Sequence, residues 1–343
     1  MALTSTSLPV ADRVNGFSYA IRNIVVEAKK VEAAGRKVAY LNIGDPIPFG
    51  FVSPPHLVEA IAGAMRAGHN GYTPSPGILE ARVAVADDFT SRGWLPDLDH
   101  LATLVTPRTR ALVVIDPNNP TGAVYPADVR RSLVEFSERH GLLLIADEVY
   151  GDLAYDGPVE PLGLIDPDAA IISYSSLSKA YLAPGWRAGW MAVGRTPRLD
   201  GLLGGLRKLA DGRLCSPGPM QYAITAALRG DRTFQVALRD QLRERADITT
   251  DRLNAIPGMR CVPARGAFYA MPQVELPAGK TDVDYVLGLL RATGVLTVFG
   301  SGFGTDPAMG AFRVVFLAAP ADLHRIYDLV AEFTGEFLAG RTA

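Results

Sequence analysis

The segment that decides the fold spans residues 170–190 and reads Ala-Ile-Ile-Ser-Tyr-Ser-Ser-Leu-Ser-Lys-Ala-Tyr-Leu-Ala-Pro-Gly-Trp-Arg-Ala-Gly-Trp. Its first residues are mostly apolar, which is typical of a buried strand. Lys179 would therefore follow the carboxyl end of that strand, where open α/β sheets bind their ligands. A lysine in such a place can lose its proton through desolvation and attack a carbonyl carbon to form an imine.

Hydroxyl and guanidinium groups flank this lysine. Ser176 and Ser178 precede it and Arg187 follows it. Hydroxyl donors beside a permanent cation suit a phosphate group. A surface lysine and arginine around a serine-rich turn would give the same residues, and this segment by itself leaves both interpretations open.

Elsewhere the chain alternates between short apolar runs and amphipathic stretches. The pattern predicts helices over 78–91 and 126–140 and strands over 111–116, 142–147, 170–176 and 189–193, and a shorter strand is expected over 295–299. Continuous apolar strands that alternate with amphipathic helices indicate a mostly parallel sheet covered by helices on both faces.

The length of 343 residues is enough for two domains. After about residue 258, strands and helices no longer alternate strictly, which suits a smaller α+β domain. We therefore expect a large domain over 46–257. The small domain would combine 1–45, including an N-terminal arm, with 258–343.

Composition and charge exclude several classes of function. The formal net charge is −2 without a basic stripe, so we expect no nucleic-acid partner. The apolar runs are too short to span a bilayer, and residues 1–13 lack a signal-peptide pattern. Cys215 and Cys261 lie far apart outside any metal-binding spacing. We therefore expect no metal site and a reducing, cytoplasmic location.

A sharp loop follows the first strand of the predicted sheet. It reads Asp116-Pro-Asn-Asn-Pro-Thr-Gly122. Its two prolines fix the backbone, so that Asn119 can present its amide at the edge of the sheet. An ordinary strand-to-helix turn rich in turn-forming residues would read the same way.

The next strand ends in a carboxylate, in Ala146-Asp-Glu-Val-Tyr150. Asp147 would be costly to bury there unless it met a cation or a hydrogen-bond donor. A protonated pyridine nitrogen would provide one, and Asp147 would keep that nitrogen charged. Tyr150 could then reach the other side of the same ring. Alternatively, Asp147 caps the segment that follows the strand.

An arginine interrupts a later apolar strand, Phe312-Arg-Val-Val-Phe316. Arg313 needs an anion, and a bidentate carboxylate matches its fork, although an internal Asp or Glu would serve equally well. Gly44 and the glycines of 300–304 permit a close approach of backbone to a ligand, or they form plain turns.

In this order, the motifs resemble the class I aminotransferases, the pyridoxal-phosphate enzymes of fold type I. The resemblance covers residues 19–338 and implies an α/β fold, with a large domain built on a mostly parallel sheet between helices and a smaller α+β domain. It further implies pyridoxal 5′-phosphate as cofactor and transamination between an amino acid and a 2-oxo acid. The motifs that carry it are Asn-Pro-Thr-Gly at 119–122, Asp147 with Tyr150, Ser-Leu-Ser-Lys…Arg at 176–187, and Arg313.

The resemblance assigns a role to each residue that binds the cofactor ring. Lys179 looks like the Schiff-base lysine, which also carries the proton between the substrate Cα and the cofactor C4′. Asp147 looks like the partner of the pyridine nitrogen. Asn119 and Tyr150 resemble the two donors to the phenolic oxygen.

Further matches surround the phosphate and the substrate. Ser176 and Arg187 resemble phosphate anchors. Tyr72 is similar to the tyrosine that reaches the neighbouring subunit's phosphate, which implies a homodimer with shared active sites. Arg313 resembles the clamp for the substrate α-carboxylate, and Gly44 would lie beside the substrate.

Within the class, Tyr19-Ala-Ile-Arg22 and the stretches 41–51 and 214–219 look most like bacterial alanine aminotransferases. Alanine and glutamate are then the expected amino donors. Arg22 becomes a candidate contact for a distal carboxylate, or else a surface arginine in the first turn of a helix. A carbon–sulfur β-lyase on the same scaffold is the enzyme alternative.

One departure from the family pattern is large. Gly93 and Trp94 are adjacent in this sequence. In the family, a strand–helix–strand stretch separates the corresponding positions. That stretch carries a phosphate-binding turn and an aromatic residue that stacks on the pyridine ring. If the printed sequence omits it, the two Cα atoms would lie well beyond ~3.8 Å apart. If the protein truly lacks it, a cofactor-poor homologue with a binding or regulatory role becomes the alternative.

Overall fold

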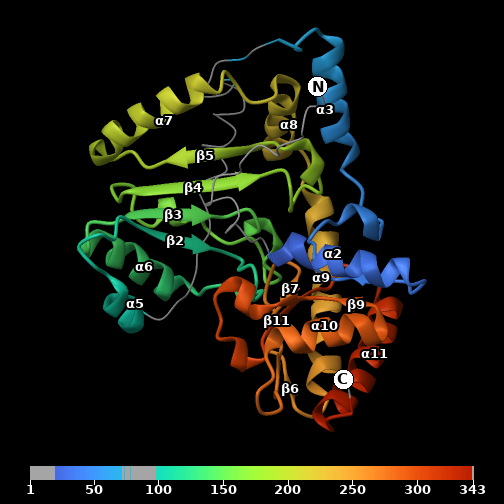
Figure 1. Cartoon of the computed structure of the whole chain (residues 1–343). Helices are drawn as coiled ribbons and strands as arrows, with labels where there is room; N and C mark the ends of the chain where they lie inside the picture. Colours follow the sequence, from blue (N-terminus) through green and yellow to red (C-terminus); the bar gives the residue numbers. More distant parts are fainter. Residues whose placement is uncertain (1–19, 72, 74–77, 79–97, 342–343) are drawn as a thin grey trace, which may run out of the picture.

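The computed structural model describes residues 20–71, 73, 78 and 98–341. Two groups of strands occupy the molecule, each with helices around it (Figure 1). The helix nearest the N-terminus of the described chain lies beside the C-terminal strands, so the ends of the sequence share one part of the fold.

The larger sheet has the strand order β2-β3-β4-β5. These strands are β2 (Ala111–Ile115), β3 (Leu143–Asp147), β4 (Ile171–Ser176) and β5 (Gly189–Val193). The first three run parallel, as predicted, and β5 pairs with β4 antiparallel. Helix α6 (Ala127–Arg139) makes the crossover between β2 and β3.

The register of this sheet brings three strand ends together. Asp147 on β3 is paired with Ile115 on β2 and with Tyr174 on β4. The loops that follow the three parallel strands therefore leave the sheet at one edge, which is where α/β sheets bind ligands.

Short strands form the second group. β1 (Ala39–Tyr40) pairs in parallel with β9 (Val295–Leu296), so the N-terminal segment joins strands from the end of the chain. The predicted single strand over 295–299 is divided into two, because β9 pairs with β1 whereas β10 pairs with β11. The remaining strands are β6 (Met259–Arg260), β7 (Tyr269–Ala270), β8 (Gln273–Val274), β10 (Val298–Phe299) and β11 (Phe312–Val315).

Helices cover both groups of strands (Figure 1). The other α-helices are α2 (Ala20–Ala33), α3 (Pro55–Arg66), α5 (Leu98–Leu104), α7 (Asp200–Gly212), α8 (Gly218–Arg229), α9 (Thr233–Asn254), α10 (Asp282–Thr293) and α11 (Pro320–Leu338). Single 3-10 turns are η1 (Ile47–Phe49), η2 (Gly151–Leu153), η3 (Leu162–Leu164), η4 (Pro184–Trp186), η5 (Pro197–Leu199), η6 (Gly300–Phe303) and η7 (Pro307–Met309).

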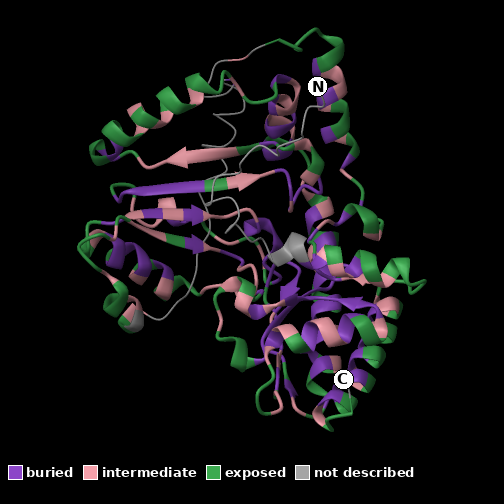
Figure 2. Cartoon of the chain, viewed as in Figure 1, coloured by how far each residue is buried: buried purple, intermediate pink, exposed green. Residues whose placement is uncertain are grey.

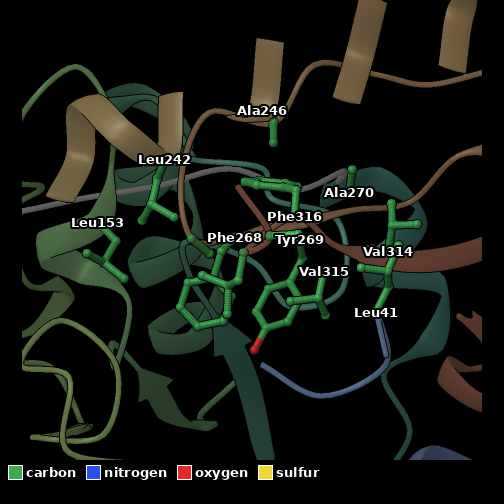
Figure 3. Packing of buried hydrophobic residues seen from close by; sticks show 14 of the residues in the cluster. Leu41, Leu153, Leu242, Ala246, Phe268, Tyr269, Ala270, Val314, Val315 and Phe316 are labelled. Carbon is green, nitrogen blue, oxygen red and sulfur yellow. The ribbon is translucent and has the colours of Figure 1, made fainter. Parts of the chain in front are cut away.

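The main core lies around the short C-terminal strands, where buried residues are densest (Figure 2). Phe268, Tyr269, Val315 and Phe316 pack there with apolar side chains of α9, and Leu41 from the N-terminal segment joins the same cluster (Figure 3). A smaller cluster lies between the larger sheet and α6. The division into domains at residues 45 and 258 stays a prediction.

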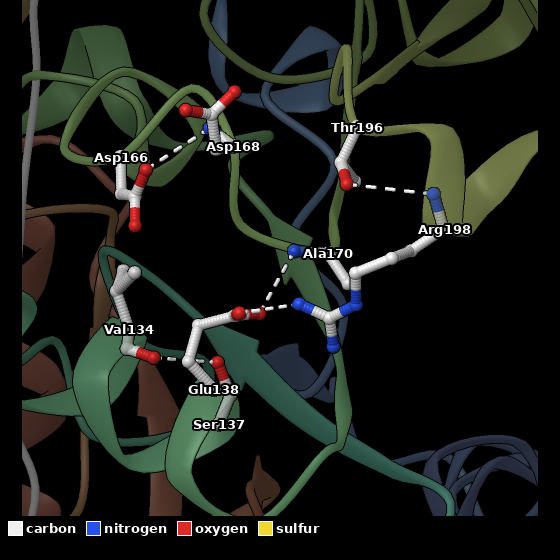
Figure 4. Close-up of polar contacts among 8 residues, drawn as sticks. All are labelled: Val134, Ser137, Glu138, Asp166, Asp168, Ala170, Thr196 and Arg198. Atoms are coloured by element: carbon white, nitrogen blue, oxygen red, sulfur yellow. Dashed lines mark hydrogen bonds and ion pairs between the residues drawn. The ribbon is translucent and has the colours of Figure 1, made fainter.

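Polar contacts fix the other end of the larger sheet. The Glu138 carboxylate, near the end of α6, accepts a hydrogen bond from the backbone N–H of Ala170 at 3.0 Å and pairs with Arg198 (Figure 4). These contacts hold α6 to the start of β4, the end opposite Lys179.

Two expectations concern parts of the chain outside the described residues. They are the helix over 78–91 and the junction between Gly93 and Trp94. Within the described ranges, no helix has both the length and the apolar character needed to cross a membrane.

Candidate active site

Lys179 lies in the turn that follows β4, with its side chain inside the protein. Its Nζ donates a hydrogen bond to the backbone carbonyl of Gly44 at 2.8 Å. Burial lowers the pKa of Lys179 to about 8; Asp45 opposes this decrease, and the positive charges of Arg313 and Arg187 add to it. A lysine of this pKa is partly unprotonated near neutral pH and can act as a nucleophile.

Gly44 brings the N-terminal segment against the lysine. The glycine is buried, and a Cβ atom there would lie 2.3 Å from the Tyr269 hydroxyl and 2.5 Å from the Phe268 ring. Only a residue without a side chain allows this approach. The Gly44 backbone thus lies close to Lys179 and Tyr269, and its predicted approach to a substrate stays a prediction.

Asp147 is the last residue of the neighbouring strand, β3, and Tyr150 follows that strand. Burial raises the pKa of the Asp147 carboxyl, although a hydrogen bond from the Val149 N–H and the charge of Lys179 oppose the increase. A cation beside Asp147 would favour its ionised form. Burial also raises the pKa of Tyr150 well above its ordinary value, so its hydroxyl stays protonated and can donate.

Arg313 is buried on β11, with 2% of its surface exposed. It donates to the Asn119 side-chain oxygen at 2.8 Å and to the Asn42 backbone carbonyl at 2.5 Å. Both acceptors are neutral, so these bonds orient the guanidinium without neutralising its charge. The predicted carboxylate clamp and the predicted amide of the 116–122 loop are thus in direct contact.

Ser176 and Arg187 belong to the β4–β5 hairpin that carries Lys179. Ser176 is paired with Gly189, and its hydroxyl accepts a hydrogen bond from the Ser178 N–H at 3.1 Å. Arg187 is exposed, adopts a left-handed backbone conformation (φ 54°) and donates to the Pro184 carbonyl at 2.7 Å. Both groups lie close to the lysine in the fold, as a phosphate site requires, but no direct contact joins them.

Two predicted site residues cannot be placed. Tyr72 lies outside the described residues, and Arg22 belongs to α2 with a side chain that is not described. Their roles at the partner's phosphate and at the substrate stay predictions. Among the described residues, no group of three His, Cys, Asp or Glu side chains could hold a metal ion.

Sequence reasoning missed four residues that the fold brings to this site. They are Asn42, Asp45, Tyr269 and Phe303. The guanidinium carbon of Arg313 lies 4.9 Å from the ring centres of both Tyr269 and Phe303. Asn42 and Asp45 lie within 41–51 and Phe303 within 300–304, but neither stretch gave these residues a role, and Tyr269 reads as an ordinary core position. Only the pairing of distant segments reveals them.

Together these residues fit one class of protein. A half-buried lysine of lowered pKa has beside it a carboxylate that needs a cation, a protonated tyrosine and a buried arginine. Lys179, Asp147 and Tyr150 lie at one edge of a mostly parallel sheet between helices, and Arg313 reaches them from β11 of a separate antiparallel sheet. This is the arrangement of a fold type I enzyme that binds pyridoxal 5′-phosphate through a lysine.

Comparison with known proteins specifies the family. The family described as aminotransferase class I and II matches residues 78–326. Alanine aminotransferase of Mycobacterium tuberculosis is 33% identical, with 92% of this chain and 90% of that protein covered. Glutamate-pyruvate aminotransferase of Escherichia coli is 31% identical, with 94% and 97% covered. The protein therefore belongs to the class I and II aminotransferases.

Solved structures agree with this assignment. Alanine aminotransferase from Pyrococcus furiosus superposes with a TM-score of 0.90 at 31% identity, and the match covers 96% of this chain and 100% of that one. An aminotransferase from Escherichia coli superposes with a TM-score of 0.89 at 29% identity. The fold is thus that of fold type I, and pyridoxal 5′-phosphate is the cofactor of the family.

The aligned length reveals a difference from the relatives. The match to the mycobacterial enzyme extends over 387 aligned positions, more than the 343 residues of this chain. That enzyme therefore contains stretches with no counterpart here. The proposed position of such a stretch, between Gly93 and Trp94, lies outside the described residues and stays a prediction.

Proposed function

We propose that this aminotransferase exchanges amino groups between alanine or glutamate and the corresponding 2-oxo acids. The observation that carries the proposal is the Lys179 amine, whose pKa burial lowers to about 8 in a site that also contains the buried Arg313. The names of the alanine and glutamate-pyruvate aminotransferases that the chain resembles support this choice of substrates.

Each residue of the site has a task in this reaction. When bound, pyridoxal phosphate supplies the electron sink for the charge that develops at the substrate Cα. Asp147 would hold a proton on the ring nitrogen, and Tyr150 and Asn119 would donate to the phenolic oxygen. Lys179 would link the cofactor to the protein. Its free amine would take the α-proton of the substrate, because a pKa of about 8 suits a base near neutral pH.

The remaining groups bind charges at the ends of the cofactor and the substrate. Ser176 and Arg187 would hold the phosphate, and the fork of Arg313 would donate two hydrogen bonds to the substrate α-carboxylate. Gly44 lets the backbone pass beside the reacting atoms. Arg22 is the candidate for the second carboxylate of glutamate.

The replacement Lys179→Ala tests the proposal. Pyruvate formation from alanine and 2-oxoglutarate should fall to background, because neither the covalent link nor the proton carrier remains. Lys208→Ala, at an exposed position on α7, is the matched control and should retain full activity. Full turnover by Lys179→Ala would refute the role of the lysine. A screen of amino donors with 2-oxoglutarate would test the preference for alanine.

We also propose a homodimer in which Tyr72 completes the partner's phosphate site, as the family resemblance implies. Light scattering of the purified protein would measure the mass, and a monomer that is active at all concentrations would contradict the proposal. Cys215 and Cys261 are both free thiols. They are consistent with the predicted cytoplasmic location, which fractionation of the native cells would test.

The second candidate function is a cofactor-poor binding protein. The stretches of the mycobacterial relative that have no counterpart here favour it. The family resemblance predicts that one of these stretches, between Gly93 and Trp94, carries the phosphate-binding turn. An absorbance band of the Lys179-linked cofactor in the purified protein decides between the two. Its absence after incubation with pyridoxal phosphate would support the binding protein and contradict the enzyme.

A further inference from the structure

Tyr269 touches three of the proposed site residues at once. The residue is 2% exposed on β7, and its hydroxyl oxygen lies 2.8 Å from that of Tyr150. Its ring centre lies 4.9 Å from the guanidinium carbon of Arg313. The same hydroxyl lies against Gly44, whose carbonyl accepts the Lys179 hydrogen bond.

Packing alone does not account for the hydroxyl of this tyrosine. Tyr269 lies within an apolar cluster that includes Phe268, Val315 and Phe316, and its oxygen points away from these neighbours (Figure 3). A phenylalanine would fill the same space. A buried hydroxyl without a partner costs free energy, so its hydrogen bond with Tyr150 explains why a tyrosine fits here.

We propose that Tyr269 is a positioning residue for Tyr150, the proposed donor to the cofactor, and for Arg313, the proposed clamp for the substrate. Its hydroxyl donates to the Tyr150 oxygen and so directs the single Tyr150 proton toward the phenolic oxygen of the cofactor. Its ring orients Arg313 for the substrate α-carboxylate. This inference rests on the proposed function, which gives Tyr150 and Arg313 their roles.

The role of the Tyr269 hydroxyl follows from the number of protons that Tyr150 and Tyr269 can donate. Each tyrosine has one O–H donor and can also accept. Burial and the neighbouring Tyr269 raise the pKa of Tyr150, so the Tyr150 hydroxyl stays protonated. The bond between the two hydroxyls uses one proton, so only one of them donates within the pair. When Tyr269 donates, the Tyr150 proton remains for another acceptor. Loss of the Tyr269 hydroxyl therefore weakens the hydrogen bond that Tyr150 makes to the cofactor.

The role of the Tyr269 ring follows from the contacts that hold the Arg313 guanidinium. Asn119 and Asn42 accept hydrogen bonds from its edge, while Tyr269 and Phe303 contact it through their π-systems. These contacts fix the orientation of the guanidinium before the substrate binds, and such preorganisation favours binding. Removal of a ring should weaken substrate binding and leave the chemistry after binding almost unchanged.

Two replacements separate the role of the Tyr269 hydroxyl from the role of its ring. Tyr269→Phe removes only the hydroxyl. The pH midpoint at which the absorbance band of the Lys179-linked cofactor titrates should move by about half to one pH unit, the size of one hydrogen bond. The KM for alanine should stay within a factor of about two. Tyr269→Leu also removes the ring, and it should raise that KM about 5- to 20-fold in addition.

Two control variants make the test specific. Phe303→Leu should raise the KM for alanine without moving the pH midpoint, because it removes the second ring and no hydroxyl. The double variant Tyr150→Phe/Tyr269→Phe should titrate like Tyr150→Phe alone, since the two hydroxyls act as one pair. Thermal unfolding of each variant shows whether the fold is intact. If Tyr269→Leu unfolds, Tyr269→Met replaces it in the KM measurement.

The outcomes distinguish this inference from the proposed function. A folded Tyr269→Phe variant with the wild-type pH midpoint would overturn the hydroxyl role. An unchanged KM in the variants that lack the ring would overturn the role toward Arg313. If the wild-type protein forms no absorbance band at all, the proposed function itself fails.

Discussion

The lowered pKa of Lys179 should determine how the cofactor-free protein captures pyridoxal phosphate. Only the unprotonated amine attacks an aldehyde. At pH 7.5 a pKa of about 8 leaves about a quarter of the lysines unprotonated, whereas the ordinary 10.5 would leave about 0.1%. The reactive fraction is thus about 200-fold larger than for an exposed lysine. The difference corresponds to about 3 kcal/mol between the two protonation states.

Stopped-flow absorbance of the cofactor-free protein mixed with pyridoxal phosphate measures this directly. The capture rate should rise about tenfold per pH unit below pH 7.5 and level off above about 8. A reference series with Nα-acetyl-lysine corrects for the ionisation of the aldehyde itself. A rate that still rises steeply at pH 9.5 would refute the burial of the Lys179 amine.

Two charge replacements test the cause of the lowered pKa of Lys179. The negative charge of Asp45 opposes the effect of burial and raises the pKa of Lys179. Asp45→Asn should therefore shift the midpoint of the capture profile to lower pH. Arg187→Gln should shift it to higher pH, because that positive charge lowers the pKa. Shifts in the opposite directions would show that other charges control the amine.

The stability of the cofactor-free protein gives a second measurement. The pKa of Lys179 is lower in the folded protein than its ordinary 10.5, so the unfolded chain binds the proton more tightly between about pH 8 and 10.5. Stability should therefore rise with pH across this window. Lys179→Met, which removes the amine, should flatten that part of the profile and raise the melting temperature at pH 7. An identical profile in the variant would contradict the linkage.

Three further replacements probe separate parts of the fold. Arg313→Lys should raise the KM for alanine at least tenfold in steady-state assays, because an ammonium cannot bind a carboxylate in bidentate fashion; an unchanged KM would remove Arg313 from the substrate site. Gly44→Ala should abolish turnover, since its Cβ would lie 2.3 Å from the Tyr269 hydroxyl, and normal activity would show that the segment can move aside. Glu138→Ala should lower the free energy of unfolding by about 1–3 kcal/mol in urea titrations, through the buried Ala170 N–H that it leaves unpaired. Its kcat/KM should stay normal because these contacts lie at the far end of the sheet.

Strong local patterns made most elements predictable. The strand over 189–193 matches β5 to the residue, and the helix over 126–140 differs from α6 by one residue at each end. Both have the periodicity that burial on one or two faces requires. The direction of β5 and the division of 295–299 were not predictable, because strand partners come from distant parts of the chain.

The sequence by itself determined the chemistry of this protein. Three local patterns are a lysine after a buried strand, an aspartate at the end of the strand before it, and an arginine inside a later strand. Their order along the chain identified the family. Each pattern is recognisable from neighbouring residues in the sequence, because a charge placed next to an apolar strand requires a specific partner. That requirement left alternatives open at Lys179, Asp147 and Arg313, and the family resemblance supplied their expected roles.

Only the tertiary structure decided which groups meet. The Gly44 carbonyl receives the Lys179 amine, Asn119 binds Arg313, and Tyr269 joins Tyr150 from the other end of the chain. Nothing local marks these pairs, since the members of each lie more than one hundred residues apart and an aromatic residue in a short strand reads as core. The lowered pKa of Lys179 has the same origin, because desolvation depends on what the whole fold packs around the amine.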